Sequence, residues 1–96
     1  MKVSFTRSAR ADLIAIGSWI ERDDPARAKS FVAELVDSCN AITDLPHGCP
    51  TISTGRHPLR RKNFKRYRII FRALPNKVRI IAVSHGSRDT HAIMAR

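Results

Sequence analysis

The side chains best suited to chemistry in this sequence are cationic, and they are concentrated in its second half. Residues 1–48 carry six Lys and Arg against seven Asp and Glu, whereas residues 49–96 carry twelve cations against one acid, Asp89. The densest part contains eight cations and no acid, namely Arg56, Arg60, Arg61, Lys62, Lys65, Arg66, Arg68 and Arg72. Because like charge at this density repels itself, the sequence predicts an anionic partner: nucleic acid, an acidic protein segment or a membrane surface.

Groups that could transfer a proton are scarce beside these cations. Cleavage of a phosphodiester needs a general base, a general acid and cations that stabilise the charge of the transition state. The second half of the chain offers Asp89, Tyr67, His85 and His91 for the proton transfers. His85 has a structural alternative, because it is expected at the end of a strand. The composition therefore favours binding over catalysis.

A second set of candidate ligands consists of Cys39, His47, Cys49 and His57. Their spacing is unlike the short pairs of ligands that nucleate most structural zinc sites, and Cys39 falls on the apolar stripe of an expected helix. We therefore expect no metal and no other cofactor. Two cysteines also suit a reducing compartment, and no apolar run has the length of a signal peptide or a membrane span. These features predict a cytoplasmic protein, and the basic residues fall on expected strands, so we also expect no membrane binding.

Hydrophobic periodicity predicts the elements that position these residues. Apolar residues recur at helical spacing over about residues 8–22, after a cap at Ser8 or Thr6, and over residues 25–42. The short polar break between the two helices predicts an antiparallel hairpin. A loop over residues 45–58 precedes a change to period two, which predicts strands at residues 59–64, 67–72 and 78–83. With a short strand at residues 3–5, the order β–α–α–β–β–β predicts one α+β domain over residues 1–96, with the helical hairpin on one face of a mostly antiparallel sheet.

Alternation along the last two strands predicts what the open face of the sheet carries. If Tyr67, Ile69 and Phe71 face the helices, and Val78, Ile80 and Ala82 do likewise, the intervening residues point away. The open face then carries an apolar strip with a cationic rim, which we call the outer strip: Ile70, Ile81 and Val83 edged by Arg68, Arg72 and Arg79. Such a surface suits an acidic amphipathic peptide. The alternative is that the C-terminal tail or a dimer mate covers the aliphatic residues.

Four segments of the chain also match a known family. They are residues 9–16, the Pro-His-Gly at 46–48, the strand R-Y-R-I-I-F-R at 66–72 and the ending V-R-I-I-A-V-S-H-G-S-R-D at 78–89. Together with the order of elements, they resemble the ParE/RelE superfamily of bacterial toxins from type II toxin–antitoxin, or plasmid stabilisation, modules. One departure is Leu59-Arg60-Arg61 in place of the family's G-x-R, which leaves open whether Arg60 or Arg61 supplies the first basic residue.

The resemblance implies a toxin that inhibits growth and is neutralised by a cognate acidic antitoxin, in a complex that binds operator DNA. The H-G-x-R-D ending is similar to the ParE branch, whose members inhibit DNA gyrase by binding it. We therefore expect the antitoxin on the outer strip, and gyrase on Arg60, Arg61, Lys62, Arg66, His85 and Arg88. The alternative is a ribosome-dependent mRNA endoribonuclease of the RelE type, with Arg61, Arg68, His85 and Arg88 as its catalytic residues. A plain nucleic-acid-binding module is a third possibility that rests on charge alone.

Overall fold

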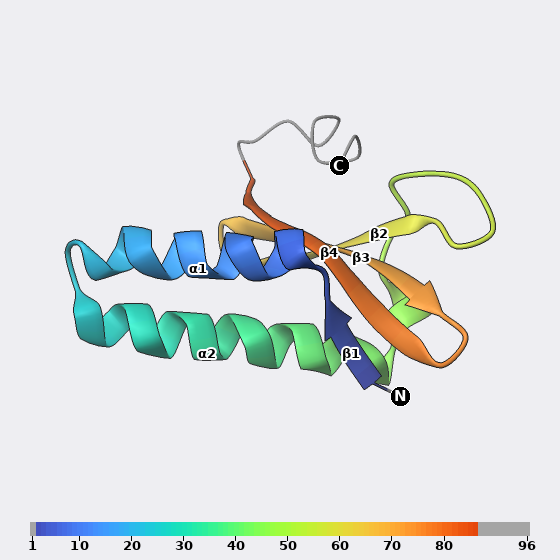
Figure 1. Cartoon of the computed structure of the whole chain (residues 1–96). Helices are drawn as coiled ribbons and strands as arrows, with labels where there is room; N and C mark the ends of the chain where they lie inside the picture. Colours follow the sequence, from blue (N-terminus) through green and yellow to red (C-terminus); the bar gives the residue numbers. More distant parts are fainter. Residues whose placement is uncertain (1, 87–96) are drawn as a thin grey trace.

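Two helices and four strands follow one another along residues 2–86, which are the residues that the computed structural model describes (Figure 1). The helices are α1 (Arg7–Glu21) and α2 (Pro25–Ala41), and two short 3-10 turns follow at Ile42–Asp44 and Pro46–Gly48. The strands are β1 (Lys2–Phe5), β2 (Leu59–Phe64), β3 (Tyr67–Leu74) and β4 (Lys77–His85). The predicted α+β class and order of elements are confirmed. No helix within the described residues is both long and apolar enough to span a membrane.

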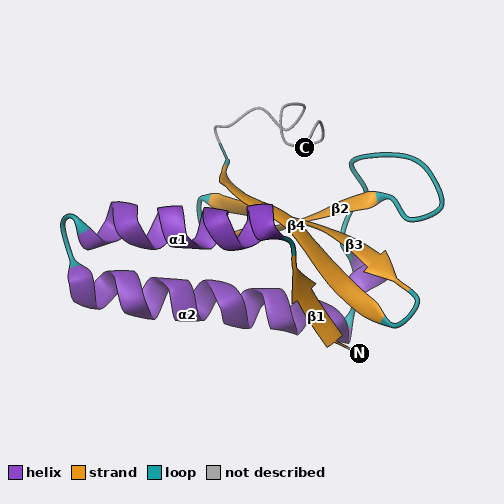
Figure 2. Ribbon diagram, in the orientation of Figure 1, coloured by secondary structure: helices purple, strands orange, loops and turns teal. Residues whose placement is uncertain are grey.

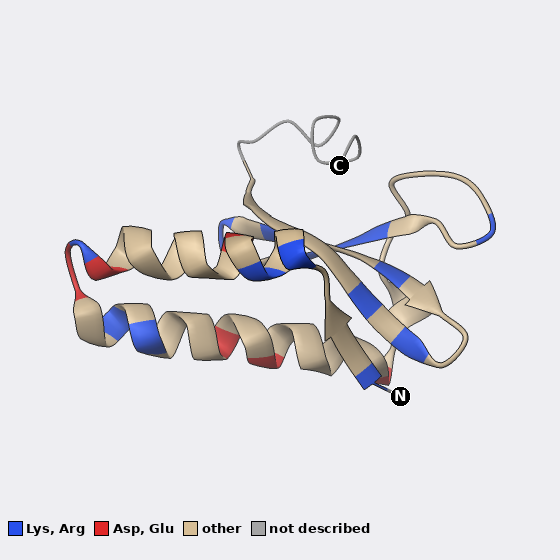
Figure 3. Ribbon diagram, in the orientation of Figure 1, with Lys and Arg blue, Asp and Glu red and all other residues tan. Residues whose placement is uncertain are grey.

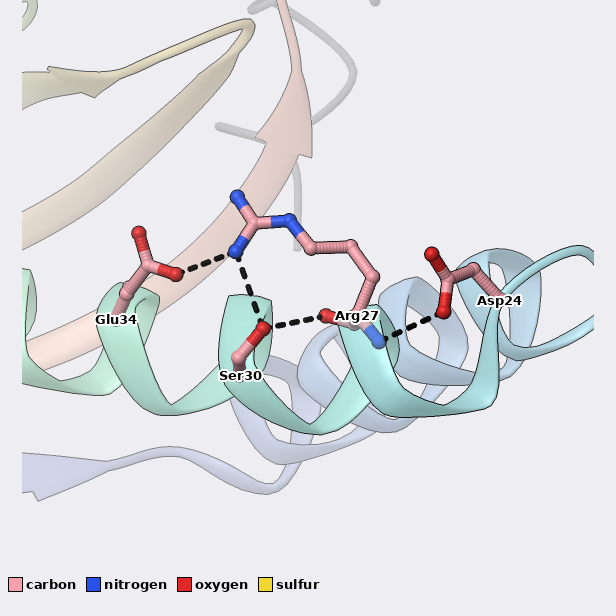
Figure 4. Close-up of polar contacts among 4 residues, drawn as sticks. All are labelled: Asp24, Arg27, Ser30 and Glu34. Atoms are coloured by element: carbon pink, nitrogen blue, oxygen red, sulfur yellow. Dashed lines mark hydrogen bonds and ion pairs between the residues drawn. The ribbon is translucent and has the colours of Figure 1, made fainter.

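Side-chain caps fix the start of each helix. Thr6 Oγ1 accepts a hydrogen bond from the backbone N–H of Ala9 at 3.0 Å, so Thr6 rather than Ser8 is the cap of α1. Asp24 Oδ1 accepts from the backbone N–H of Arg27 at 3.0 Å at the start of α2 (Figure 4). The Arg27 guanidinium also contacts Ser30 and forms an ion pair with Glu34 along the same helix. These local bonds satisfy backbone donors that the first turn of a helix leaves without partners.

The sheet has the order β1-β4-β3-β2, in which β1 runs parallel to β4 and the other pairs are antiparallel. The helical hairpin covers one face of this sheet (Figure 2). The core between the two layers is built from buried hydrophobic residues, among them Phe31, Leu35, Cys39, Ile69, Phe71, Val78 and Ile80. The ring of Phe31 meets those of Phe64 and Tyr67 edge-on, with both pairs of centroids 5.6 Å apart.

A bulge in β4 changes which residues face the helices. Phe71 pairs with Ile80 and Ile70 pairs with Ala82, so Ile81 is an extra residue with no partner in β3. Val83 consequently lies in the core beneath the helices, whereas Ala82 lies on the open face. The predicted orientations of Val83 and Ala82 were therefore wrong, because one inserted residue reverses the alternation for the rest of the strand.

The start of α1 supplies hydrogen bonds to the backbone around this bulge. The backbone N–H and the hydroxyl of Thr6 donate to the carbonyl oxygens of Ile80 and Ile81, each at 3.0 Å. Asp12 Oδ2 accepts from the backbone N–H of Val83 at 2.9 Å. Backbone groups that a bulge removes from the ladder need other partners. The helix therefore satisfies the irregular part of β4.

Part of the loop between the helices and the sheet pairs with the outer edge of β2. Ile52 donates its backbone N–H to the carbonyl of Leu59 at 2.8 Å, and Arg61 donates its backbone N–H to the carbonyl of Pro50 at 3.0 Å. Ile52 also packs against a second, smaller cluster of buried residues on the open face, formed by Leu59, Ile70 and Ala82. The segment that was predicted to be an irregular loop thus covers aliphatic residues of the sheet.

Burial of Cys39 leads to a prediction about pH. Burial raises the pKa of the Cys39 thiol to about 11, an effect that the nearby Lys62 ammonium opposes. An unfolded thiol loses its proton near pH 8.5–9. The folded state holds this proton up to about pH 11. The contribution of the Cys39 thiol to the free energy of unfolding is therefore complete below about pH 9 and decreases as the pH rises from 9 to 11.

Thiol titration at pH 8 should therefore show rapid reaction of Cys49 alone, with Cys39 reacting after denaturant is added. Cys49 is partly exposed, whereas Cys39 is fully buried. A Cys49→Ser variant, with Cys39 as its one remaining thiol, isolates the protected residue. Rapid labelling of that variant in the native state would contradict the prediction.

Candidate functional site

Four arginines from three neighbouring strands meet on the face of the sheet that the helices leave open. Arg61 of β2 is a diagonal neighbour of both Arg68 and Arg72 of β3, and Arg72 lies directly opposite Arg79 of β4. Diagonal neighbours in an antiparallel pair are about 7–8 Å apart, which is within reach of arginine side chains. We call Arg61, Arg68, Arg72 and Arg79 the arginine cluster.

Neutral oxygen atoms orient two members of the arginine cluster. Arg72 Nη1 donates to the carbonyl of His57 at 2.6 Å, and Arg79 Nη1 donates to Ser4 Oγ at 3.4 Å. These contacts fix the direction of the side chains but leave their charge in place. Like charges directly opposite each other, as Arg72 and Arg79 are, destabilise a strand pair. The arrangement therefore works against the stability of the sheet.

The acidic residues of the described chain are absent from the strands of the sheet. The strands β1 to β4 contain no Asp or Glu, and the acids of the described residues lie on the helices and their connections (Figure 3). Lys and Arg positions are spread over the strands in the same view. The open face consequently has a positive potential, which attracts an anionic partner and speeds its association.

Two of the six residues predicted to contact a target lie on the helix-facing side of β2. Arg60 Nη1 donates to the carbonyl of Cys49 at 2.8 Å, and Lys62 Nζ donates to the carbonyl of Ser38 at 2.9 Å. Lys62 thus connects the edge strand to α2, and Arg60 connects it to the segment that follows α2. Arg61, between them, belongs to the open face. The register therefore separates Arg60 from Arg61, and Arg61 is the one that joins the arginine cluster.

A basic hollow of about 310 Å³ lies at the turn between β2 and β3. It is lined by Asn63, Lys65, Arg66, Tyr67, Arg68, His85 and Gly86. Gly86 donates its backbone N–H to the carbonyl of Arg66 at 2.7 Å, and a Cβ on Gly86 would lie 3.2 Å from that oxygen. The glycine thus permits a close approach between the end of β4 and the turn. Arg66 is exposed there.

His85, the main candidate for proton transfer, belongs to the opposite side of the sheet from the arginine cluster. It pairs with Tyr67 in the register, and the two rings meet edge-on with centroids 5.6 Å apart. Tyr67 packs against the core beneath the helices. Of the predicted ribonuclease residues, Arg61 and Arg68 therefore share a face and His85 does not, while Arg88 lies outside the described residues, as do Asp89 and His91.

Beside His85 lies an open cleft of about 460 Å³ between α1 and the end of the sheet. Its walls include Asp12, Ile16, Trp19, Tyr67, Val83 and His85. Asp12 is a residue that the sequence reasoning did not identify as part of a site. A signal was available, because Asp12, Ile16 and Trp19 follow one another at helical spacing and so share one side of α1.

The outer strip is partly confirmed and partly corrected. Arg68, Arg72 and Arg79 lie on the open face as predicted, and Ile81 is partly exposed there. Ile70 is on the predicted face but fully buried, and Val83 is beneath the helices. The open face is therefore more cationic and less apolar than expected. Within residues 2–86, no three His, Cys, Asp or Glu side chains come together as metal ligands.

Comparison with known proteins identifies similarity to toxin–antitoxin systems. The model of one family, described as the ParE toxin of the type II toxin–antitoxin system parDE, matches residues 3–90. A chain from the chromosomal ParDE toxin–antitoxin system of P. aeruginosa has 20% identity and a TM-score of 0.73. A chain from the toxin–antitoxin complex RelBE2 of Mycobacterium tuberculosis has 22% identity and a TM-score of 0.62. Each match covers 88% of this chain and 95% of the other, and at these identities it shows a shared fold. No curated protein is significantly similar in sequence.

Proposed function

Because this chain belongs to the ParE toxin family of type II toxin–antitoxin systems, we propose that it inhibits growth by binding DNA gyrase in the cytoplasm. The observation that carries the proposal is the separation of charge from proton transfer. The arginine cluster occupies the open face of the sheet, and His85 belongs to the helix-facing side. A surface of this kind can bind an anionic partner, and of its four arginines Arg68 alone lines the basic hollow that His85 shares.

The partner that neutralises the toxin is proposed to be an antitoxin with an acidic segment. The similarity to chains of two toxin–antitoxin systems supports this assignment. Arg68, predicted to bind the antitoxin, and Arg61, predicted to bind gyrase, are diagonal neighbours on one face. An acidic segment that covers Arg68 also blocks Arg61, so the antitoxin neutralises by occupying the target-binding surface. The same complex is proposed to bind operator DNA through the antitoxin.

One observation favours the alternative, a ribosome-dependent mRNA endoribonuclease. The cleft beside α1 brings Asp12, Tyr67 and His85 around one cavity, so proton carriers do come together in the fold. Arg61, Arg72 and Arg79 lie on the other side of the sheet, whereas Arg68 also lines the hollow at the turn. A ribonuclease would therefore have to hold the scissile phosphate in the basic hollow at the turn, which Arg66, Arg68 and His85 line together.

A supercoiling assay with purified gyrase tests the proposal. The wild-type protein should inhibit supercoiling, and His85→Ala should inhibit to a similar extent, because His85 belongs to the helix-facing side of β4 and binding requires no proton transfer. For a ribonuclease, loss of a general acid or base lowers activity by about 100-fold to 10,000-fold. Normal supercoiling by gyrase, together with discrete codon-specific cuts in mRNA that His85→Ala removes, would establish the alternative instead.

A further inference from the structure

The outward side of α1 has a regular pattern that the toxin surface does not use. Arg7, Ala11, Ile14, Ser18 and Glu21 follow one another at spacings of four, three, four and three residues, and all five are exposed. Ile14 is 71% exposed, which makes it one of the most exposed large hydrophobic residues of the described chain. We call these five residues the α1 ridge. This spacing is the one by which one helix packs lengthwise against another.

The α1 ridge is symmetric about Ile14. Arg7 lies seven residues before Ile14 and Glu21 lies seven residues after it, at the two ends of the helix. A second copy of α1 that runs antiparallel about a two-fold axis at Ile14 would place each Arg7 opposite the Glu21 of the other copy. The small side chains of Ala11 and Ser18 lie between, where they permit close approach of the two helices. A two-fold interface requires a surface that complements itself in this way.

The charges at the ends of α1 oppose the dipole of the helix itself. Arg7 and Arg10 lie near its start, where the first turn contains no acid, and Glu21 ends it, followed by Asp23 and Asp24. Cations at the N-terminus and anions at the C-terminus of a helix are each unfavourable. An antiparallel partner helix reverses this, because its negative end then lies beside Arg7. Arg22, the cation nearest the acidic end, lies over the ring of Trp19, 5.2 Å from the ring centroid.

A shallow groove beside the α1 ridge can receive aliphatic side chains of a partner. It runs between α1 and α2 and is lined mainly by Leu13, Ile14, Gly17, Ala28 and Val32. A Cβ on Gly17 would lie 3.3 Å from a methyl group of Val32, so the two helices are close together there. Ridges of one helix that enter the grooves of another give the usual packing of helices.

The distribution of charge indicates that the partner at the α1 ridge is a second copy of the chain. The helical layer, residues 7–44, carries five cations and seven acids. An anionic partner is drawn to the arginine cluster, whereas a neutral surface with opposite charges at its two ends complements itself. We propose that the α1 ridge is a homodimer interface in which two copies pack α1 against α1 in antiparallel orientation. A helix of this length is about 22 Å long, so the contact is small and we expect a dissociation constant in the micromolar range, about 1–100 μM.

Sedimentation velocity of the full chain tests the dimer. The ionic strength should be about 0.15 M, because repulsion between the cationic sheets of two copies is then screened beyond about 8 Å. The wild-type protein should shift from monomer to dimer across the micromolar range. Arg7→Glu places a glutamate opposite Glu21 twice and should weaken the dimer at least about tenfold. The double variant with Arg7→Glu and Glu21→Arg restores the complementarity and should return the dissociation constant to within about threefold of wild type.

A further variant, Ile14→Glu, places two carboxylates at the axis and should leave the protein monomeric at all concentrations tested. All the substituted positions are exposed, so circular dichroism should match that of the wild-type protein, and the melting temperature of the variants at Arg7 and Glu21 should be equal or higher, because these changes remove unfavourable charges from the ends of α1. A wild-type chain that stays monomeric above about 200 μM would overturn the proposal, since that exceeds the expected range. A dimer that the double variant fails to rescue from Arg7→Glu, or that Ile14→Glu leaves intact, would overturn it equally.

Discussion

Replacing Arg61 and Arg68 together by glutamate should reduce the affinity for gyrase at least about 100-fold, or about 2.7 kcal/mol. The two arginines are diagonal neighbours within the arginine cluster. Each substitution removes an attraction to an anionic partner and adds a repulsion. The measurements are growth arrest on induction and the concentration of purified protein that halves gyrase supercoiling.

The control for this prediction changes the same amount of charge elsewhere. Arg22 and Lys29 are exposed on the helical hairpin, away from the open face of the sheet. Arg22→Glu with Lys29→Glu should leave gyrase inhibition within about threefold of wild type, because charges beyond a Debye length are largely screened. If the two double variants lose activity equally, total charge rather than the arginine cluster determines binding. If neither loses activity, the open face is not the binding surface.

Val83→Asp should unfold the protein or lower its free energy of unfolding by at least about 4 kcal/mol. Val83 is 2% exposed and packs in the core beneath the helices. A carboxylate there loses its hydration among the apolar side chains of the core. Urea denaturation followed by circular dichroism measures the loss.

The matched control is Ile81→Asp, two residues earlier on the same strand. Ile81 is partly exposed and packs against the buried residues of the open face, so an aspartate there keeps contact with water. We expect a loss below about 2 kcal/mol. A larger loss at Ile81 than at Val83 would mean that β4 alternates without a bulge and that Val83 faces outward.

Local signals in the sequence were sufficient to predict the elements of the fold. The short polar break before residue 25 marks the start of α2, and the alternation of Arg68 to Arg72 marks a strand with two different faces. The same alternation predicted that Arg68, Arg72 and Arg79 share the open face. These features depend on neighbours along the chain, so a single sequence is enough to detect them.

The bulge at Ile81 could not be predicted in the same way, because its partners are distant in sequence. Its backbone is satisfied by Thr6 and Asp12, about 70 residues earlier in the chain. In the sequence, Asp12 cannot be distinguished from an ordinary acidic residue on the surface of a helix. The burial of Ile70 has a similar origin, since Ile52 reaches its cluster from a loop without periodicity. The orientation of Val83, and with it the shape of the candidate site, depended on these long-range contacts.

The pairing of the loop at residues 50–52 with β2 also limits how copies of this protein can associate. A bare outer strand offers a row of unpaired N–H and C=O groups, on which further chains can stack into fibres. The hydrogen bonds of Pro50 and Ile52 already occupy the first half of that row. Removal of this segment should therefore promote aggregation at concentrations at which the intact protein stays in solution.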